Sequence, residues 1–282
     1  MKKKKKGSFA TFLLILILLL GLSLLLYPSF SEFWNSRHQT QTIASYESMV
    51  ANLKEEDFTR FLEEAAIYNR NLLRRDNGYA LTESLETDYY DLLNVGGSGI
   101  MGYIDIPSIH VHLPIYHGTS DAVLEVAVGH LDWSSLPVGG EGTHCLLSGH
   151  RGLPSARLFT DLDQLAVGDY FTIHVLDRVL TYEVSKILIV EPHETQNLII
   201  EEKKDLVTLI TCTPYGVNSH RLLVQGHRVD NLEEAQEVRV TADAMVVEQL
   251  VVAPFVLAPI LLGMLLWMLI GSARKKKRRK SS

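Results

Sequence analysis

Two uninterrupted apolar runs lie near the two ends of this 282-residue chain, at residues 8–27 and 250–270, and neither contains a charged residue. About 20 apolar residues span a hydrocarbon core of roughly 30 Å, and prolines such as Pro254 and Pro259 are tolerated in membrane spans. The pattern predicts a transmembrane helix at each end. A cleaved signal peptide is the alternative for the first run, although no A-x-A cleavage site follows it. A buried core helix is the alternative for the second.

Between the runs, residues 32–75 carry apolar side chains at helical spacing, with acidic residues among them. This period predicts two helices joined near Lys54 to Asp57, which act as a spacer packed on the main domain. The stretch that follows, "RRDNGYALTESLETDYYDLLNVGGSG", is polar and rich in turn formers and therefore predicts a long loop.

From about residue 99 the pattern changes to short apolar segments separated by turn signals such as Gly139-Gly140 and Gly168-Asp169. Regular short strands are typical of a β-sandwich or a β-barrel, so the class is mainly β. Short helices are expected at Asp121 to Val126 and at Ala156 to Leu165. The candidate strands are residues 100–106, 110–116, 143–149, 170–176, 180–190, 205–211 and 221–229.

Charge divides the chain sharply. The tail before the first apolar run has five lysines and the tail after the second has seven basic residues, and removing those twelve from the 27 Lys and Arg leaves 15 bases against 33 acids. An acidic middle argues against nucleic acid as a partner, because phosphate binding requires clustered cations. Basic clusters beside membrane spans stay cytoplasmic, so both termini are expected in the cytoplasm and residues 28–249 outside, with the lipid bilayer as a partner.

The segment "TLITCTPYGVNSHRLLVQGHR" raises the question of chemistry, because an apolar strand ends on Cys212 and the next strand begins near Arg221. The intervening turn formers predict a hairpin that places Cys212 nearly opposite Arg221. Alternation along the strands lets the thiol and the guanidinium project into one groove.

A third group of the right chemistry is His150, in "LLSGHRGLP" at the end of another apolar strand. A cysteine with a histidine base and a charge-stabilising arginine suits acyl transfer. Spacing alone leaves a packed core thiol as the alternative for Cys212.

The second cysteine, Cys145, lies five residues before His150 on the same predicted strand, which is roughly 16 Å if His150 neighbours Cys212. Disulfides need much shorter separations, so we expect no bridge and a small buried apolar residue at Cys145. His110, His112 and His117 were weighed as zinc ligands, but a solvated strand face is the preferred interpretation. Arg151 is expected to be a surface or loop-bracing residue.

Several separated motifs occur in the order found in sortases. "TLITC" with "TPYGVNSHRLLVQGHR" resembles their TLxTC hairpin, and "LSGHRGLPSARLFTDLDQL" resembles their histidine segment. "GYIDIPSIHVHLPIYHGTS", "VGHLDWSSLPVGG", "VGDYFTIHVL" and a span at each end are similar to the class C, pilin-polymerising branch.

The resemblance implies a closed eight-stranded β-barrel with N-terminal helices and a transmembrane helix at each end, anchored on a Gram-positive cell surface. The implied organisation is basic cytosolic tails at 1–7 and 271–282, spans at 8–27 and 250–270, a helical spacer with a lid-like loop at 28–94, the catalytic barrel at 95–230 and an acidic linker at 231–249.

By the same resemblance, Cys212 is the nucleophile, His150 the acid/base and Arg221 the oxyanion-stabilising or substrate-orienting group. The enzyme would cleave an LPXTG-like sorting signal through a thioester and join it to a lysine of a pilin subunit. The matched motifs imply no metal and no cofactor. The rival functions are a housekeeping-type sortase that attaches surface proteins to peptidoglycan precursor, a thiol protease that uses water, and a surface receptor without catalysis.

Class C sortases usually hold a lid over the site through an Asp-Pro-aromatic motif. Here Asp76 precedes Tyr79, and Asp88 precedes Tyr89, with no proline between acid and ring. Without proline the φ restraint is missing, so we expect a weak or absent lid, although an acid-aromatic pair can still plug the groove.

Overall fold

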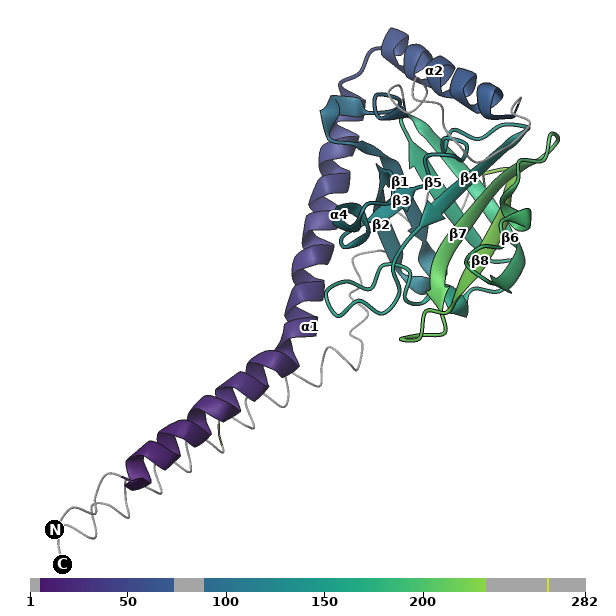
Figure 1. Cartoon of the computed structure of the whole chain (residues 1–282). Helices are drawn as coiled ribbons and strands as arrows, with labels where there is room; N and C mark the ends of the chain where they lie inside the picture. The colour runs from purple at the N-terminus through teal and green to yellow at the C-terminus, as the bar shows by residue number, and fades with distance from the viewer. Residues whose placement is uncertain (1–5, 74–88, 232–262, 264–282) are drawn as a thin grey trace, which may run out of the picture. The chain divides into compact units, whose positions relative to one another are not determined.

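The computed structural model describes residues 6–73, 89–231 and Gly263. Eight strands close into a barrel in the order β1-β2-β3-β4-β7-β8-β6-β5 (Figure 1). The strands are β1 Ile100–Ile106, β2 Val111–His117, β3 Val128–His130, β4 Thr143–Ser148, β5 Tyr170–Val175, β6 Arg178–Val190, β7 Asp205–Thr213 and β8 His220–Val229. The helices are α1 Lys6–Ala51, α2 Glu55–Leu73 and α4 Asp121–Leu124, with short 3₁₀ turns at Val95–Gly97, Pro107–Ile109, Leu162–Gln164 and Gln196–Leu198.

Two strand pairs are parallel, and the others are antiparallel. β2 pairs with β3 in parallel, and so does β4 with β7. Parallel strands cannot be joined by a tight hairpin, so the segments between β2 and β3 and between β4 and β7 are crossover connections. The long connection from β4 to β7 contains β5 and β6. Because the crossover separates β4 from β7 in the sequence, their adjacency cannot be inferred from local turn signals.

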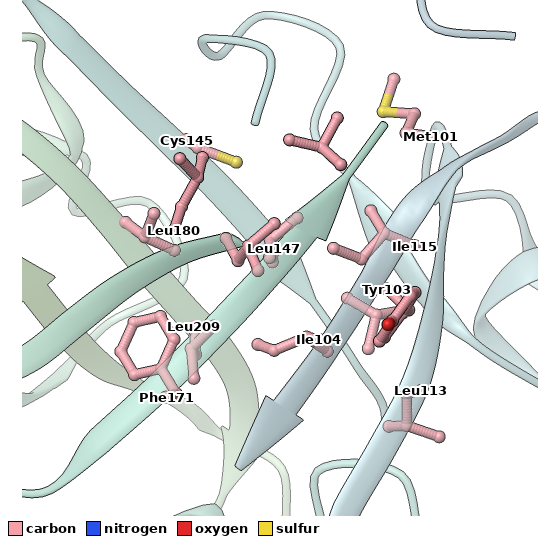
Figure 2. Close-up of a cluster of buried hydrophobic side chains, with 14 of the residues drawn as sticks. Met101, Tyr103, Ile104, Leu113, Ile115, Cys145, Leu147, Phe171, Leu180 and Leu209 are labelled. Atoms are coloured by element: carbon pink, nitrogen blue, oxygen red, sulfur yellow. The ribbon is translucent and has the colours of Figure 1, made fainter. Parts of the chain in front are cut away.

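The interior of the barrel is filled by inward side chains of every wall (Figure 2). Ile104, Phe171 and Leu209 have no exposed surface. Burial of this apolar surface is the main favourable contribution to folding, at roughly 25 cal/mol per Å².

The second half of α1 packs against the barrel through Ile43, Tyr46 and Val50, which recur at spacings of three and four on one helix face. The Tyr46 hydroxyl donates to the Met101 carbonyl at 2.9 Å and accepts from the Leu176 amide at 2.8 Å. A buried phenol is thereby satisfied on both sides, which ties the helix to two strand ends.

The α2 helix lies across one end of the barrel (Figure 1). It begins with Glu55, Glu56 and Asp57, whose charges favour a helix N-terminus. Asn69 is buried in it and exchanges two hydrogen bonds with the backbone of Leu136, at 3.2 and 2.7 Å. The helix therefore fixes the connection between β3 and β4 as well as covering the core.

The predicted fold is confirmed in its main features and wrong in several details. Two helices do meet near Lys54, but the first runs without a break through Pro28 from Lys6. The strand expected at 110–116 begins at Val111, because His110 adopts a left-handed conformation with φ of 55°. The strand β3 was not predicted, and the helix expected at 156–165 is only the 3₁₀ turn Leu162–Gln164.

The helix Leu13–Ala51 is the one candidate in the described part of the chain that is long and apolar enough to cross a membrane. The apolar run at 250–270 lies outside the described residues, except for Gly263.

Candidate functional site on the outer face of the β4–β7–β8–β6 wall

The pairing register divides the side chains of this wall into two faces. Ile210 of β7 lies opposite Ser148 of β4 and Leu223 of β8, and Leu223 in turn lies opposite Leu188 of β6. Directly paired residues point to the same side of a sheet, and the side alternates at every residue. The register runs without a bulge through this region, so one set of residues faces outward across four strands.

Cys212 belongs to this outward set. It lies directly opposite Arg221, as the hairpin predicted, and Arg221 lies opposite Val190 of β6. Cys212 is partly buried and its thiol is free. The thiol and the guanidinium therefore emerge on the same face, two residues beyond the Ile210–Leu223 pair.

His150 follows directly after β4, and the parallel pairing with β7 continues to its neighbour. The Gly149 amide donates to the Ile210 carbonyl at 3.0 Å, and the Thr211 hydroxyl donates to the Gly149 carbonyl at 2.8 Å. The β4–β7 pairing ends at Ser148 and Ile210, and continuing the same alternation by two residues would set His150 opposite Cys212 on the outward face.

Gly149 is required at this point because of a close approach. A Cβ atom at Gly149 would lie 2.7 Å from the ring of Phe159, which has no exposed surface and cannot move aside easily. The amide of Phe159 also donates to the His150 carbonyl at 3.1 Å. The loop that carries His150 is thus packed back against its own downstream segment.

The guanidinium of Arg221 is held by the turn of its own hairpin. Its Nη1 donates to the carbonyl of Asn218 at 3.2 Å and to the carbonyl of His220 at 3.1 Å. Asn218 has a positive φ of 58°, which orients its carbonyl in the turn. Both bonds use Nη1, so a substrate oxygen could be engaged through Nη2 or Nε while these two bonds stay in place.

Next to these three residues, the outward face carries a separate apolar cluster, called here the outer cluster. Its members come from β4, β6, β7, β8 and the two connections that pass over them. They are Leu146, Val190, Leu198, Ile210 and Leu223, with Leu131, Trp133 and Leu188 packed against them.

His144 lies on the same face and was not singled out from the sequence. Its Nδ1 is 2.9 Å from the Ile199 carbonyl and its Nε2 is 2.7 Å from the Thr208 hydroxyl. Burial lowers the pKa of His144, which favours the neutral ring, with Nδ1–H donating to Ile199 and Nε2 accepting from Thr208. The ring therefore joins Ile199 of the β6–β7 connection to Thr208 on β7.

Cys145 occupies the opposite face. It pairs with Val207 of β7 and lies within the barrel core near Leu147 and Leu180 (Figure 2). Its side chain is buried, and burial raises the pKa of its thiol well above the ordinary value. The prediction of a small buried residue is confirmed, and both cysteines are free thiols.

The histidines first weighed as metal ligands are engaged otherwise. His112 and His174 both hydrogen-bond to Asp105. Burial alone would raise the pKa of Asp105, but the bonds from the two histidines lower it to about 2. His117 is buried and not on a solvated face, with its ring nitrogens 2.9 and 2.7 Å from the carbonyls of Gly99 and Leu92. Within the described ranges, no three His, Cys, Asp or Glu side chains are placed to hold a metal ion.

Tyr89, the ring of one acid-aromatic pair, does not lie in the outer cluster. It has no exposed surface, and its hydroxyl lies 2.9 Å from Nδ1 of His130 and accepts from the Gly118 amide at 3.0 Å. This ring therefore anchors the chain to the barrel core and does not plug the outer face. Asp76, Tyr79 and Asp88 lie outside the described residues, so the weak-lid hypothesis stays a prediction.

A closed barrel that sets a free thiol opposite a guanidinium on one face, with a histidine directly after the neighbouring strand, fits the class of thiol-dependent acyl-transfer enzymes. Residues 104–229 match the family described as "Sortase domain". The chain belongs to the sortase family, whose members are cysteine transpeptidases.

Solved structures agree with this assignment. Sortase C1 from Streptococcus agalactiae is 47% identical with a TM-score of 0.67, over 68% of this chain and 100% of that chain. Clostridium perfringens sortase C, solved with the C-terminal cell wall sorting motif, is 43% identical with a TM-score of 0.61, over 68% of this chain and 100% of that one.

Among curated proteins, sortase D from Bacillus subtilis (strain 168) is 33% identical over 131 residues. The match covers 45% of this chain and 63% of that relative, so the chain spans a little under two thirds of its length.

Proposed function

We propose that this protein is a membrane-anchored class C sortase, which cleaves an LPXTG-like sorting signal and joins it to a lysine amine of a pilin subunit. The observation that carries the proposal is the register that sets Cys212 opposite Arg221, and the parallel β4–β7 pair, which leads directly into His150, supports it. The similarity to sortase C structures from two genera supports the pilin branch.

In the first half-reaction, the Cys212 thiolate attacks the carbonyl carbon of the Thr–Gly bond. The carbonyl oxygen becomes an oxyanion, which the Arg221 guanidinium stabilises by donating hydrogen bonds. The C–N bond then breaks, His150 donates a proton to the departing glycine nitrogen, and a thioester remains on Cys212.

In the second half-reaction, the lysine amine attacks the thioester carbonyl and gives a proton to His150. The C–S bond breaks and restores the thiolate, while a new amide joins the two proteins. Arg221 stabilises this second oxyanion as well, so one guanidinium serves both steps. No metal or cofactor is needed for this proton and electron balance.

The outer cluster supports the strand ends that carry Cys212 and Arg221. Leu146, Ile210 and Leu223 come from three adjacent strands and are buried, with 0%, 7% and 2% of their surface exposed. The signal would lie over the partly buried Cys212 and Arg221, while the buried cluster holds the strands beneath it in place.

A housekeeping-type sortase is the second candidate, because curated sortase A proteins also match the chain. Sortase A from Streptococcus agalactiae serotype III (strain NEM316) is 25% identical over 221 residues. The two candidates share the first half-reaction and differ in the amine that resolves the thioester.

The deciding experiment incubates the full-length protein in detergent micelles with a sorting-signal peptide and a purified pilin. Mass spectrometry should find a thioester at Cys212 and an isopeptide bond to a pilin lysine. Transfer to a peptidoglycan-stem amine in place of lysine would favour the housekeeping role. Hydrolysed peptide without either adduct would favour a thiol protease, and an unmodified Cys212 would remove the enzymatic proposal.

We further propose two membrane spans, at 8–27 and 250–270, with both termini in the cytoplasm and the barrel outside. The basic residues beside each apolar run support this orientation. Protease added to intact protoplasts should remove the barrel and leave epitope tags at both termini protected, whereas a digested C-terminal tag would contradict the second span.

A further inference from the structure

Arg151 is the residue directly after His150, and its side chain is only 9% exposed. It contacts three separate segments. Nη2 pairs with Oδ2 of Asp163 at 2.5 Å, Nη1 donates to the Thr213 hydroxyl at 3.4 Å, and the guanidinium carbon lies 5.8 Å from the centre of the Tyr215 ring. Of the two roles expected for Arg151, a surface or a loop-bracing residue, these contacts confirm loop bracing.

The sequence positions of these contacts give them significance for the site. Arg151 adjoins His150, and its partner Thr213 adjoins Cys212. One guanidinium therefore connects the loop that carries the imidazole to the strand end that carries the thiol. Asp163 secures the guanidinium from the opposite side, on the 3₁₀ turn Leu162–Gln164.

The backbone at Gly152 brings Tyr215 close to the same loop. Gly152 has a φ of +77°, and a Cβ atom there would lie 3.0 Å from the Tyr215 ring. Tyr215 is 61% exposed, so its position over Arg151 comes from contact with the arginine and the glycine rather than from burial in the core.

Packing alone does not account for an arginine at this position. Its Nε is buried and has no hydrogen-bond partner among the residues that the structure describes. An unsatisfied buried donor is costly, and a well-packed apolar side chain generally braces two loops with less loss. A planar guanidinium suits a position where several partners must be held in a fixed geometry.

We propose that Arg151 is a positioning residue for acyl transfer, which fixes the distance between His150 and Cys212 through Thr213 and Tyr215. The inference rests on the proposed function, in which these two groups exchange protons with the same substrate. Arg151 itself does not touch the reacting atoms. A displacement of about 1 Å between the thiol and the imidazole is enough to lower the rate on the order of 10²-fold.

The test compares Arg151→Gln, Arg151→Lys and a matched control, Arg157→Gln, in the full-length protein in detergent micelles. Arg157 makes an ion pair of the same length, 2.5 Å, with Asp161 in the same connection, but its side chain is 44% exposed. Arg151→Gln should lower kcat for transfer of a sorting-signal peptide about 10²-fold with little change in KM. Arg157→Gln should leave both near the wild-type values.

The conservative variant separates charge and direction from mere volume. Arg151→Lys keeps the cation but lacks the fork that spans Thr213, Asp163 and Tyr215, so it should recover about tenfold of the loss. A rise in KM at constant kcat in Arg151→Gln would mean that Arg151 binds substrate and would overturn the positioning role. Wild-type kinetics in Arg151→Gln would overturn it as well.

A double-variant cycle tests the route through Thr213. If Arg151 acts through it, Thr213→Val combined with Arg151→Gln should lose no more activity than Arg151→Gln alone, whereas independent, additive losses would contradict the route. Thr213→Val also provides the test if Arg151→Gln fails to fold.

If the wild-type protein does not process the peptide, the proposed function fails. The role of Arg151 is then tested by the reactivity of the Cys212 thiol alone. The rate at which iodoacetamide alkylates Cys212 at pH 7, read by peptide mass spectrometry, should fall in Arg151→Gln and partly recover in Arg151→Lys. Equal rates in all three proteins would overturn the inference.

Discussion

The two cysteines of this chain lie on neighbouring strands of the same barrel wall, yet they face opposite environments. Cys145 on β4 pairs with Val207 and points into the core, and Cys212, five residues further along β7, points outward beside Arg221. Both belong to the same wall, and both carry a free thiol. What differs is the face of the sheet to which each side chain points, because successive residues along a strand alternate between the two faces. Cys145 therefore packs in the core, whereas Cys212 is a candidate nucleophile.

The largest expected effect comes from exchanging each thiol for a methyl group. Cys212→Ala should abolish transfer of a sorting-signal peptide, by about 10⁴-fold or more, because no other described group can form the thioester. Cys145→Ala should retain at least about a third of the wild-type kcat/KM, since its sulfur faces away from the site. Product formation is measured by mass spectrometry for both variants. Transfer activity in Cys212→Ala would show that Cys212 is not the nucleophile.

The second effect is on thiol reactivity in the native protein. Alkylation at pH 8 should modify Cys212 at least about 10²-fold faster than Cys145, because Cys145 is buried and its raised pKa keeps it protonated. In a chemical denaturant the two rates should converge. Equal rates without denaturant would show that the two faces are equally open.

The third effect separates the faces by stability and binding. Leu209→Ala, on the inner face, should lower the free energy of unfolding by about 2–5 kcal/mol while leaving the KM of the folded protein unchanged. Ile210→Ala, the next residue along β7, truncates a buried member of the outer cluster, so it should lower the free energy of unfolding and also raise the KM for the peptide, because that cluster supports the strand end that carries Cys212. Denaturant melts and peptide kinetics provide the readouts, and a KM effect from Leu209→Ala alone would reverse the assignment of faces.

The smallest effect is a pH dependence that belongs to Cys145. Its pKa is raised by burial, so above about pH 9 the unfolded chain loses the proton that the folded chain keeps. The unfolded state then binds fewer protons, and stability must fall as pH rises, by at most about 1.4 kcal/mol per pH unit. Cys145→Ala should lose that slope relative to wild type between pH 9 and 10.5, whereas identical slopes would place Cys145 in contact with solvent.

Local signals predicted the site hairpin well. Turn formers between Cys212 and Arg221 set a loop length from which direct pairing followed, and the structure has that pairing. His150 was indicated by its place at the end of an apolar strand, but the parallel pairing of that strand, β4, with β7 leaves no local signal and could not be predicted. The three-residue strand Val128–His130 is too short to give a periodic pattern and was missed.

Other features were hidden because tertiary contacts decide them. The burial of Arg151 depends on Asp163, Thr213 and Tyr215, which come from two distant segments. The role of His144 depends on Ile199 and Thr208 in the same way. The expected span at 8–27 and the expected helix after residue 32 form one helix, because a membrane-type apolar helix tolerates a proline such as Pro28.

The parallel pairing of β4 with β7 has a consequence for how this protein can vary. The β6–β7 connection, residues 191–204, can lengthen or shorten without altering which way Cys212 points, because the alignment is set inside β4 and β7. A single residue inserted between Val207 and Cys212 would instead turn the nucleophile into the core and expose its neighbour. Changes in length should therefore be tolerated in that connection and not within β7.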